Sequence, residues 1–374
     1  MTIADRTVPF LDLHAAHQEI TEELDAAWRR VLRSGRYLLG SETENFEREF
    51  ADYCGNRECV TVGSGLSALE LALRALGIGA GDEVVVPAHT FIATWLAVSA
   101  TGARPVPAEP EDRTCNLDPA AVTAAIGPRT AAILPVHLYG HPADMAELGS
   151  IARSNGLALV VDAAQAHGAR RAGRTAGSES RAVTTFSFYP GKNLGALGDG
   201  GAVVTGDSDV ARRLRLLRNY GSKEKYRHQI AGHNSRLDEL QAAILRVKLS
   251  RLDDWNNRRR QVAQRYLAGL AGIPGLTLPV PAAQTDPSWH LFTVRSRNRD
   301  ALGAALAGHG VQTQVHYPVP PHLSEAYAAA GWTTGDFPVT ERISREVLSL
   351  PMGPHLIRSD VDYVLDSVYR STQR

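Results

Sequence analysis

Short apolar segments alternate with amphipathic ones between residues 57 and 205. Glycine, proline and aspartate separate these segments, as they do at the ends of regular elements. Such an alternation predicts a mostly parallel β-sheet whose strands are joined by helices. Several apolar segments are hydrophobic at successive positions, which is expected of strands covered on both faces. The seven predicted strands are 59–62, 83–86, 104–107, 131–136, 158–161, 183–187 and 202–205.

The segments between these strands have the spacing of amphipathic helices. A helix start is predicted at Asp118, because an aspartate followed by a proline suits the first turn of a helix. The predicted helices are 67–76, 92–101, 119–126 and 145–155. We therefore expect a large sheet domain of the α/β class.

The pattern changes beyond residue 234. Residues 236–270 are nearly free of Gly and Pro, and their apolar positions predict a long helix, straight or kinked, that leads out of the sheet domain. A proline-rich loop follows. Beyond it we expect a smaller α/β unit, with strands at 290–294 and 311–315 and helices at 301–307, 341–348 and 359–369.

The length of 374 residues also predicts two domains, because single hydrophobic cores stop growing below this size. We place the large domain at residues 1–250 and the small C-terminal domain at residues 251–374.

Charge and composition exclude several classes of protein. The chain has 40 Lys+Arg and 40 Asp+Glu, so it lacks the net positive charge on which binding to nucleic acid or anionic membranes relies. No apolar run approaches the roughly 20 residues of a membrane-spanning helix, and the first 20 residues lack the apolar stretch of a signal peptide. We therefore expect a cytoplasmic protein. Cys54, Cys59 and Cys115 show no C-x-x-C spacing, so we expect neither a disulfide framework nor a metal site.

The most informative segment is TTFSFYPGKNLGALGDGG, residues 184–201, in which a strand leads into a glycine-rich loop with one lysine, Lys192. Alone, this lysine is typical of a solvated loop. Upstream, however, Asp162 ends the predicted strand LALVVD, and open α/β sheets bind ligands at the carboxyl ends of their strands. A carboxylate there can keep a pyridine nitrogen protonated while a lysine forms a Schiff base. Asp162 alone could be a helix cap, but the pair favours pyridoxal 5'-phosphate (PLP).

A third segment, VTVGSGLSALELALRAL at residues 60–76, predicts a strand, a glycine turn and a helix whose free amide groups can bind a phosphate. Its spacing Gly63-x-Gly65-x-x-Ala68 also matches a dinucleotide fingerprint, so an NAD-dependent dehydrogenase is a competing hypothesis. The acidic residues Asp82 and Glu83 disfavour it, because they precede the next strand, whereas a ribose-binding acid should follow it.

Together these segments resemble the DegT/DnrJ/StrS family of sugar aminotransferases, which are PLP enzymes of fold type I. The resemblance covers most of the chain and is carried, in the family's order, by GSGLSALELAL, DEVVVPAHTFIATW, PVHLYGHPADM, VVDAAQAHGA, FSFYPGKNLGALGDGGAVVT, RNYGS and NSRLDELQAAIL. It implies an aspartate aminotransferase-like fold, with a large, mostly parallel seven-stranded sheet domain and a smaller α/β C-terminal domain. It also implies PLP as the cofactor.

The resemblance implies roles for particular residues. Lys192 in PGKN would form the Schiff base and transfer the proton, and Asp162 in VVDAAQ would pair with the pyridine nitrogen. Gln165 in the same motif would lie against the ring and its phenolic oxygen, and Phe91 in HTFIAT would stack on the ring face. Core packing is the alternative for Phe91 and Gln165.

Ser64 and Gly65 in GSGLS, with Ser187 in FSF, would hold the phosphate. Asn234 in HNSRLDELQ would reach the phosphate of a partner subunit, which implies a homodimer with active sites at the interface. The remaining candidates lie in the smaller domain, where His316, Tyr317 and His322 in HYPVPPHL could bind a large substrate or be turn and core residues.

The implied reaction transfers an amino group from L-glutamate to a nucleotide-linked keto sugar. The stretch RNYGSKEKYRHQIAGHNSRLDELQAAILRVKL resembles members that aminate C3 of dTDP-linked 3-keto-6-deoxyhexoses, precursors of antibiotic and surface-polysaccharide sugars. Aminotransferases that act at C4 of 4-keto sugars or on keto-inositols share the motifs and remain alternatives. Related PLP-dependent dehydratases lack the Schiff-base lysine, so Lys192 disfavours them. It also disfavours a non-catalytic regulator that kept the PLP fold.

Overall fold

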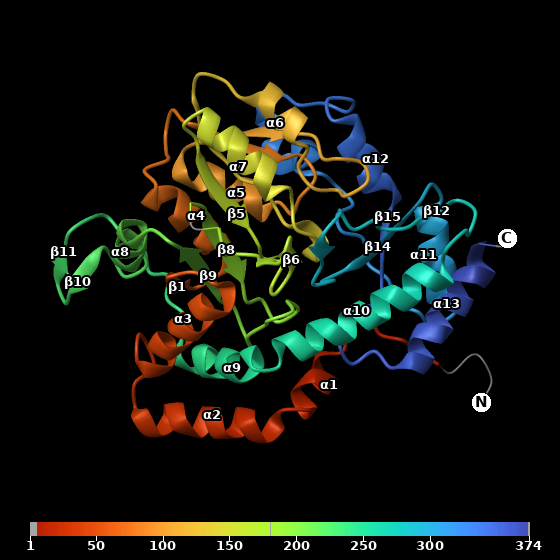
Figure 1. Ribbon diagram of the computed structural model, residues 1–374, viewed down its shortest axis with the longest axis horizontal. Helices are drawn as coiled ribbons and strands as arrows, with labels where there is room; N and C mark the ends of the chain where they lie inside the picture. The colour runs from red at the N-terminus through yellow and green to blue at the C-terminus, as the bar shows by residue number, and fades with distance from the viewer. Residues whose placement is uncertain (1–5, 180, 373–374) are drawn as a thin grey trace.

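The computed structural model describes residues 6–179 and 181–372. Its centre is a seven-stranded sheet with the strand order β1-β9-β8-β5-β4-β2-β3 (Figure 1). Only β9 runs antiparallel to its neighbours; the other neighbouring strands pair in parallel. The strands are β1 (Glu58–Val62), β2 (Glu83–Pro87), β3 (Arg104–Ala108), β4 (Thr130–Ile133), β5 (Ala158–Asp162), β8 (Val183–Ser187) and β9 (Gly201–Thr205). All seven predicted strands are thus confirmed. The fourth ends early, at Ile133, and beyond it Val136 forms an isolated bridge with Asp162.

Helices cover both faces of the sheet because successive strand residues point to opposite sides. On one face, α4 (Gly65–Ala75), α5 (Ala93–Thr101) and α8 (Ser208–Leu217) enclose a core that includes Val84, Val86 and Trp95. On the other face, Val85 packs with α6 (Pro119–Ala125) and α7 (Met145–Ser154). Asp118 caps α6 by accepting a hydrogen bond from the backbone NH of Ala120, which confirms the predicted helix start.

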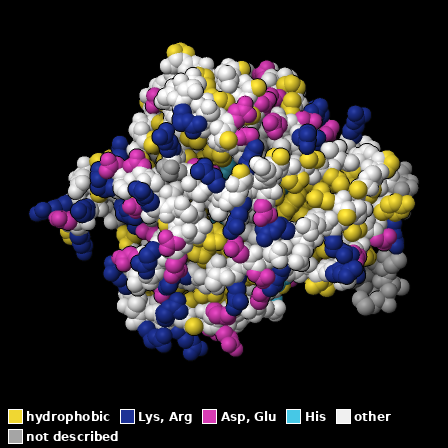
Figure 2. Space-filling model, in the orientation of Figure 1, with side chains coloured by type: hydrophobic (Ala, Val, Ile, Leu, Met, Phe, Trp, Pro, Cys, Tyr) yellow, Lys and Arg dark blue, Asp and Glu magenta, His cyan; other side chains and the backbone are white. Residues whose placement is uncertain are grey.

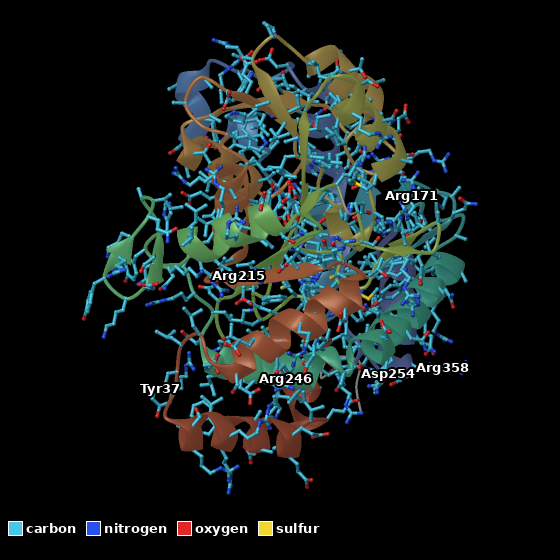
Figure 3. The ribbon with its side chains drawn as sticks, turned by 60° about the vertical axis from the view of Figure 1, so that its left-hand side comes forward. Tyr37, Arg171, Arg215, Arg246, Asp254 and Arg358 are labelled. Carbon is cyan, nitrogen blue, oxygen red and sulfur yellow. The ribbon has the colours of Figure 1, made fainter. Side chains whose placement is uncertain are left out.

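The N-terminal helices are α1 (Leu13–Gln18), α2 (Thr21–Ser34) and α3 (Ser41–Cys54). Helix α3 completes the second face of the sheet together with α9 (Glu239–Leu249), through a cluster rich in phenylalanine. Arg246 of α9 binds Glu42 and Glu49 of α3 where the two helices meet (Figure 3).

The predicted long helix is two helices, α9 and α10 (Leu252–Gly269), which run one after the other from the sheet to the C-terminal part (Figure 1). They are interrupted at Ser250, whose hydroxyl donates to the carbonyl of Val247 at 2.7 Å, while the NH of Arg251 bonds three residues back to the carbonyl of Lys248. A serine that binds a backbone carbonyl competes with regular helix bonding, which accounts for the break.

The C-terminal part contains an antiparallel sheet of β12 (Leu276–Thr277), β14 (Phe292–Ser296) and β15 (Val347–Leu350). Helices α11 (Arg299–Gly308) and α13 (Arg358–Thr372) share its core, and α12 (Pro338–Glu346) contacts β14. The strand predicted at 290–294 and the helices predicted at 301–307 and 359–369 are confirmed by β14, α11 and α13.

One prediction in this part is wrong. Residues 311–315 form no regular strand, only single bridges from Val311 to Val8 and from Gln314 to Ser349. The helix predicted at 341–348 is confirmed as α12, which ends earlier, at Glu346, because Val347 and the residues after it pair with β14.

The remaining elements are short. They are β10 (Ser222–Glu224) and β11 (Arg227–His228), a sheet of β13 (Thr285–Asp286), β6 (Arg170–Arg171) and β7 (Arg174–Thr175), and the 3-10 turns Leu138–Gly140, Pro321–Leu323 and Glu325–Ala330.

The boundary predicted at residue 250 falls at the break between α9 and α10 and remains a prediction. Val8, which precedes α1, packs in the core of the C-terminal part. Residues 1–5, on which the expected location partly depends, lie outside the described residues. Within the described ranges, no helix has both the length and the apolar character to cross a membrane. Basic and acidic side chains are intermingled on the face shown in Figure 2.

Candidate functional site

The loop that carries Lys192 is compact rather than flexible. It follows β8, and the backbone NH groups of Phe188 and Ala196 bond across it to Gly200 and Phe188 at 2.8 Å each. At Gly195 a Cβ atom would lie 2.3 Å from the carbonyl oxygen of Pro190, so only glycine fits this turn. Lys192 is therefore held in one place.

Helix α9 fixes this loop from outside. Gln241 accepts a hydrogen bond from the NH of Leu197 at 2.8 Å, and the ammonium group of Lys248 donates to the carbonyl of Gly195 at 2.7 Å. Both residues were missed as site residues in the sequence. The available signal was a lysine among buried helix positions that are otherwise apolar apart from Glu239 at the start of the helix.

Asp162 ends β5, and its carboxylate is enclosed with 6% of the residue exposed. It accepts hydrogen bonds from the hydroxyl of Thr94 at 3.0 Å and from the NH of Ala164 at 3.1 Å. Burial raises the pKa of Asp162, and these two bonds and the charge of Lys192 oppose the rise. Burial lowers the pKa of Lys192 to about 8, against the opposing charge of Asp162. The structure thus brings the two predicted residues together, and Thr94 is a partner that sequence reasoning missed.

The predicted phosphate residues also meet. Ser64 caps α4 by accepting a hydrogen bond from the NH of Ser67, and Gly65 is the first residue of that helix. A Cβ atom on Gly65 would lie only 2.6 Å from the Cβ of Ser187, which places the end of β8 directly against the helix start. Free amide groups at a helix N-terminus together with two hydroxyl groups suit a phosphate.

An exposed aromatic ring borders the same region. Phe91 is 52% exposed, and its ring centroid lies 5.3 Å from that of Tyr317. Gln165 is buried with a fixed orientation, because its carbonyl oxygen accepts from the NH of Tyr139 at 2.5 Å and its amide donates to the hydroxyl of Tyr317 at 2.9 Å. Phe91, Gln165 and Tyr317 therefore form one contiguous wall.

The other candidates differ in their placement. His316 bonds to the hydroxyl of Ser349 at 2.8 Å, and burial, followed by the charge of Lys192, lowers its pKa to about 4. His322 instead packs in the C-terminal part, 3.3 Å from a carboxylate oxygen of Glu341, so its contact with a substrate remains a prediction. Asn234 is exposed on the segment between β11 and α9.

These groups fit PLP. A buried carboxylate suits the pyridine nitrogen, an amine of lowered pKa suits the aldehyde carbon, hydroxyl and amide groups suit the phosphate, and an exposed phenylalanine offers a ring face.

Comparisons with known proteins agree with this geometry. The sequence model of the DegT/DnrJ/EryC1/StrS aminotransferase family matches residues 18–369. The chain is 60% identical over 367 residues to dTDP-3-amino-3,4,6-trideoxy-alpha-D-glucose transaminase of Streptomyces venezuelae, covering 98% of this chain and 97% of that protein. It is 63% identical over 358 residues to the erythromycin biosynthesis sensory transduction protein EryC1 of Saccharopolyspora erythraea, covering 96% and 98%.

The fold agrees equally well. The crystal structure of DesV from S. venezuelae superposes with a TM-score of 0.97 at 60% identity, over 98% of this chain and 99% of that one. The chain belongs to the DegT/DnrJ/EryC1/StrS family of PLP-dependent aminotransferases.

Proposed function

We propose that this enzyme transfers an amino group from L-glutamate to C3 of a dTDP-linked 3-keto-6-deoxyhexose, in the biosynthesis of a deoxyamino sugar. The observation that carries the reaction type is Lys192, an amine of lowered pKa on a rigid loop beside the buried Asp162. The sugar is argued from the S. venezuelae relative, whose name specifies a 3-amino sugar linked to dTDP.

We propose the following roles for the residues of the site. When bound, PLP supplies an electron-withdrawing ring that stabilises negative charge on the substrate carbon. Lys192 would hold the cofactor through its amine and, once released, accept and return a proton at that carbon. Asp162 would keep the proton on the pyridine nitrogen. Burial would make this ion contact strong, because little water screens it.

The remaining cofactor residues would hold and orient the group. Ser64, Gly65 and Ser187 would bind the phosphate, while Phe91 and Gln165 would face the ring. Ser64, Gly65 and Ser187 converge where β8 ends and α4 begins, which supports the phosphate site. Phe91 and Gln165 both contact Tyr317, which supports the ring site.

We further propose a homodimer in which Asn234 reaches the phosphate bound by the partner subunit. Its exposure in a single subunit leaves it free for such a contact. His316 and Tyr317 would line the sugar pocket, since both lie on the side of Lys192 where the C-terminal part meets the large sheet domain.

Absorption spectroscopy tests the cofactor chemistry. Purified protein loaded with PLP should show a visible absorption band that glutamate bleaches and that Lys192→Ala abolishes. Lys223→Met is the control, because Lys223 is exposed and lies away from the loop that carries Lys192, and the band should survive its loss. A band that survives Lys192→Ala, or a colourless protein that binds NAD, would contradict the assignment.

Turnover with dTDP-linked 3-keto and 4-keto 6-deoxyhexoses, compared side by side, tests the position of amination. We expect the 3-keto sugar to be preferred. Preference for the 4-keto sugar or for a keto-inositol would refute the proposed substrate. A third outcome is a protein that shows the PLP band, does not lose it with glutamate and turns over neither sugar. This outcome would favour the regulatory role that the name of EryC1 describes for that relative.

A further inference from the structure

Next to Lys192 in the sequence, Asn193 connects the side chains of Asn256 and His290 through hydrogen bonds. Asn193 follows the lysine directly, and its amide nitrogen donates to the side-chain oxygen of Asn256 and to the carbonyl of Ser288, at 2.8 Å each. Both amide hydrogens of Asn193 are therefore in use. The amide nitrogen of Asn256 in turn donates to the carbonyl of His167 at 2.8 Å, which leaves its oxygen as the acceptor for Asn193.

This network determines the tautomer of His290. The side-chain oxygen of Asn193 lies 3.2 Å from Nδ1 of His290 and can only accept a hydrogen bond, so Nδ1 must carry the hydrogen. Burial, followed by the charges of Lys192 and Arg259, lowers the pKa of His290 well below its ordinary value. The ring is therefore neutral, and its Nε2 atom has a free lone pair.

The ring is also fixed in position. Arg259 is buried, and its guanidinium donates to the backbone carbonyls of Trp289 and His290 at 3.2 and 3.3 Å. The backbone of His290 is thus held from one side and its Nδ1 atom from the other. His290 itself is half-buried, and its Nε2 has no hydrogen-bond partner within the described ranges.

We propose that Nε2 of His290 is a fixed hydrogen-bond acceptor for a hydroxyl group of the sugar substrate, close to the carbon that reacts at Lys192. This inference rests on the proposed function. The two substrates differ in what they can offer such an acceptor. The amino group of glutamate reacts at the cofactor, and its remaining polar groups are carboxylates, which only accept hydrogen bonds and would be repelled by a lone pair. A sugar hydroxyl can donate. His290 therefore favours the sugar and is a specificity-determining residue for the second half of the reaction.

Two substitutions distinguish the role of Nδ1 of His290 from that of Nε2. In His290→Asn, the side-chain amide can still donate to Asn193 from the position of Nδ1, but nothing replaces Nε2. In His290→Gln, the amide reaches the position of Nε2 and offers an oxygen acceptor there, but the donor to Asn193 is lost.

The two half-reactions should respond differently to these variants. Each PLP-loaded protein is mixed with glutamate, and the amino form so produced with the dTDP-linked 3-keto sugar, in single-turnover experiments followed by the visible band. We expect His290→Asn to leave the glutamate step within about twofold and to slow the sugar step about tenfold, the effect of one hydrogen bond of ordinary strength. His290→Gln should restore most of the sugar rate.

Equal losses in the two half-reactions of His290→Asn would overturn the inference, because His290 would then act on Lys192 and not on the sugar. Unchanged rates in both would also overturn it. Failure of the proposed function is a distinct result, since the wild-type protein would then react with glutamate or with the sugar too slowly to measure.

Nitrogen-15 NMR of histidine-labelled protein tests the tautomer independently of activity. The signals of His290 are assigned by their loss in His290→Gln. We expect an unprotonated Nε2 and a protonated Nδ1 at neutral pH, with the Nε2 signal shifting when the dTDP-linked sugar binds. A protonated Nε2, or an Nε2 signal that the sugar leaves unmoved, would refute the inference.

Discussion

Replacement of Lys248 by methionine should stabilise the protein and slow the enzyme at the same time. Lys248 is 4% exposed, and its ammonium group donates to the carbonyl of Gly195 in the loop that holds Lys192. It also lies 3.2 Å from Nε2 of His17. Methionine has a similar length and shape but carries no charge, so Lys248→Met removes a buried charge together with the anchor of the loop.

The magnitude follows from the pKa of Lys248, which burial lowers from 10.5 to about 8. Because the folded pKa lies below the unfolded one, the charged lysine costs stability at neutral pH. A fall of this size corresponds to about 3 kcal/mol. Loss of the hydrogen bond leaves the Gly195 carbonyl unpaired at a cost of about 1 to 3 kcal/mol. We therefore expect a net gain of up to about 2 kcal/mol at pH 7.

The pH dependence gives the sharper test. The unfolded state binds more protons than the folded state between pH 8 and 10.5, so the wild type gains stability as the pH rises through this interval. The advantage of Lys248→Met should therefore shrink between about pH 8 and about pH 10. Thermal unfolding of the two PLP-loaded proteins at several pH values measures it. Lys223→Met, at an exposed position, is the control and should show no such trend.

Activity should move in the opposite direction. Without its contact to Lys248, the Gly195 carbonyl is free to shift, and turnover should fall about tenfold through the displaced Lys192 loop. A loss of stability at neutral pH that does not change with pH would refute the reasoning, because it would mean that the ammonium group is not penalised by burial.

Three further substitutions follow from single contacts. Gly65→Ala brings a Cβ atom to 2.6 Å from the Cβ of Ser187, so PLP affinity in a spectroscopic titration should fall at least about tenfold. Thr94→Val removes a hydrogen bond that opposes the rise in the pKa of Asp162, so the acid limb of the pH–rate profile should move to higher pH. Arg218→Met leaves a buried carboxylate on α3 without its cation and should destabilise the protein by about 3 to 5 kcal/mol, seen as a lower unfolding temperature. An unchanged titration, profile or melting curve would count against the respective contact.

The sheet could be predicted because its strands are continuous apolar runs that helices must cover on both sides. The same pattern failed where a side chain or a pairing partner decides the local structure. Ser250 breaks the long helix through one hydrogen bond, which no periodicity reveals. Val347 continues the apolar spacing of α12, yet it pairs with β14, and only the folded chain brings that strand alongside.

Some residues of the candidate site could likewise be predicted from the sequence, and others could not. Lys192 and Asp162 could be found because each stands at a position where its chemistry is conspicuous, in a glycine-rich loop and at the end of a strand. Thr94, Gln241 and His290 could not, because what they do depends on which distant segments meet. The tautomer of His290, for example, is set by a hydrogen bond to Asn193, which lies far away in the sequence.

Burial links the stability of this protein to its chemistry. An amine with a pKa of about 8 is neutral in about a tenth of the molecules at pH 7, whereas an ordinary lysine is neutral in fewer than about one in a thousand. The desolvation that costs stability at Lys192 would thus supply the free amine that its proposed role in transamination requires. Asp162 limits the effect, because its charge opposes the loss of the lysine proton while burial opposes its own ionisation. Lys248 has the same lowered pKa, with burial as its cause, so its charge costs stability while its hydrogen bond to the Gly195 carbonyl holds the loop that carries Lys192.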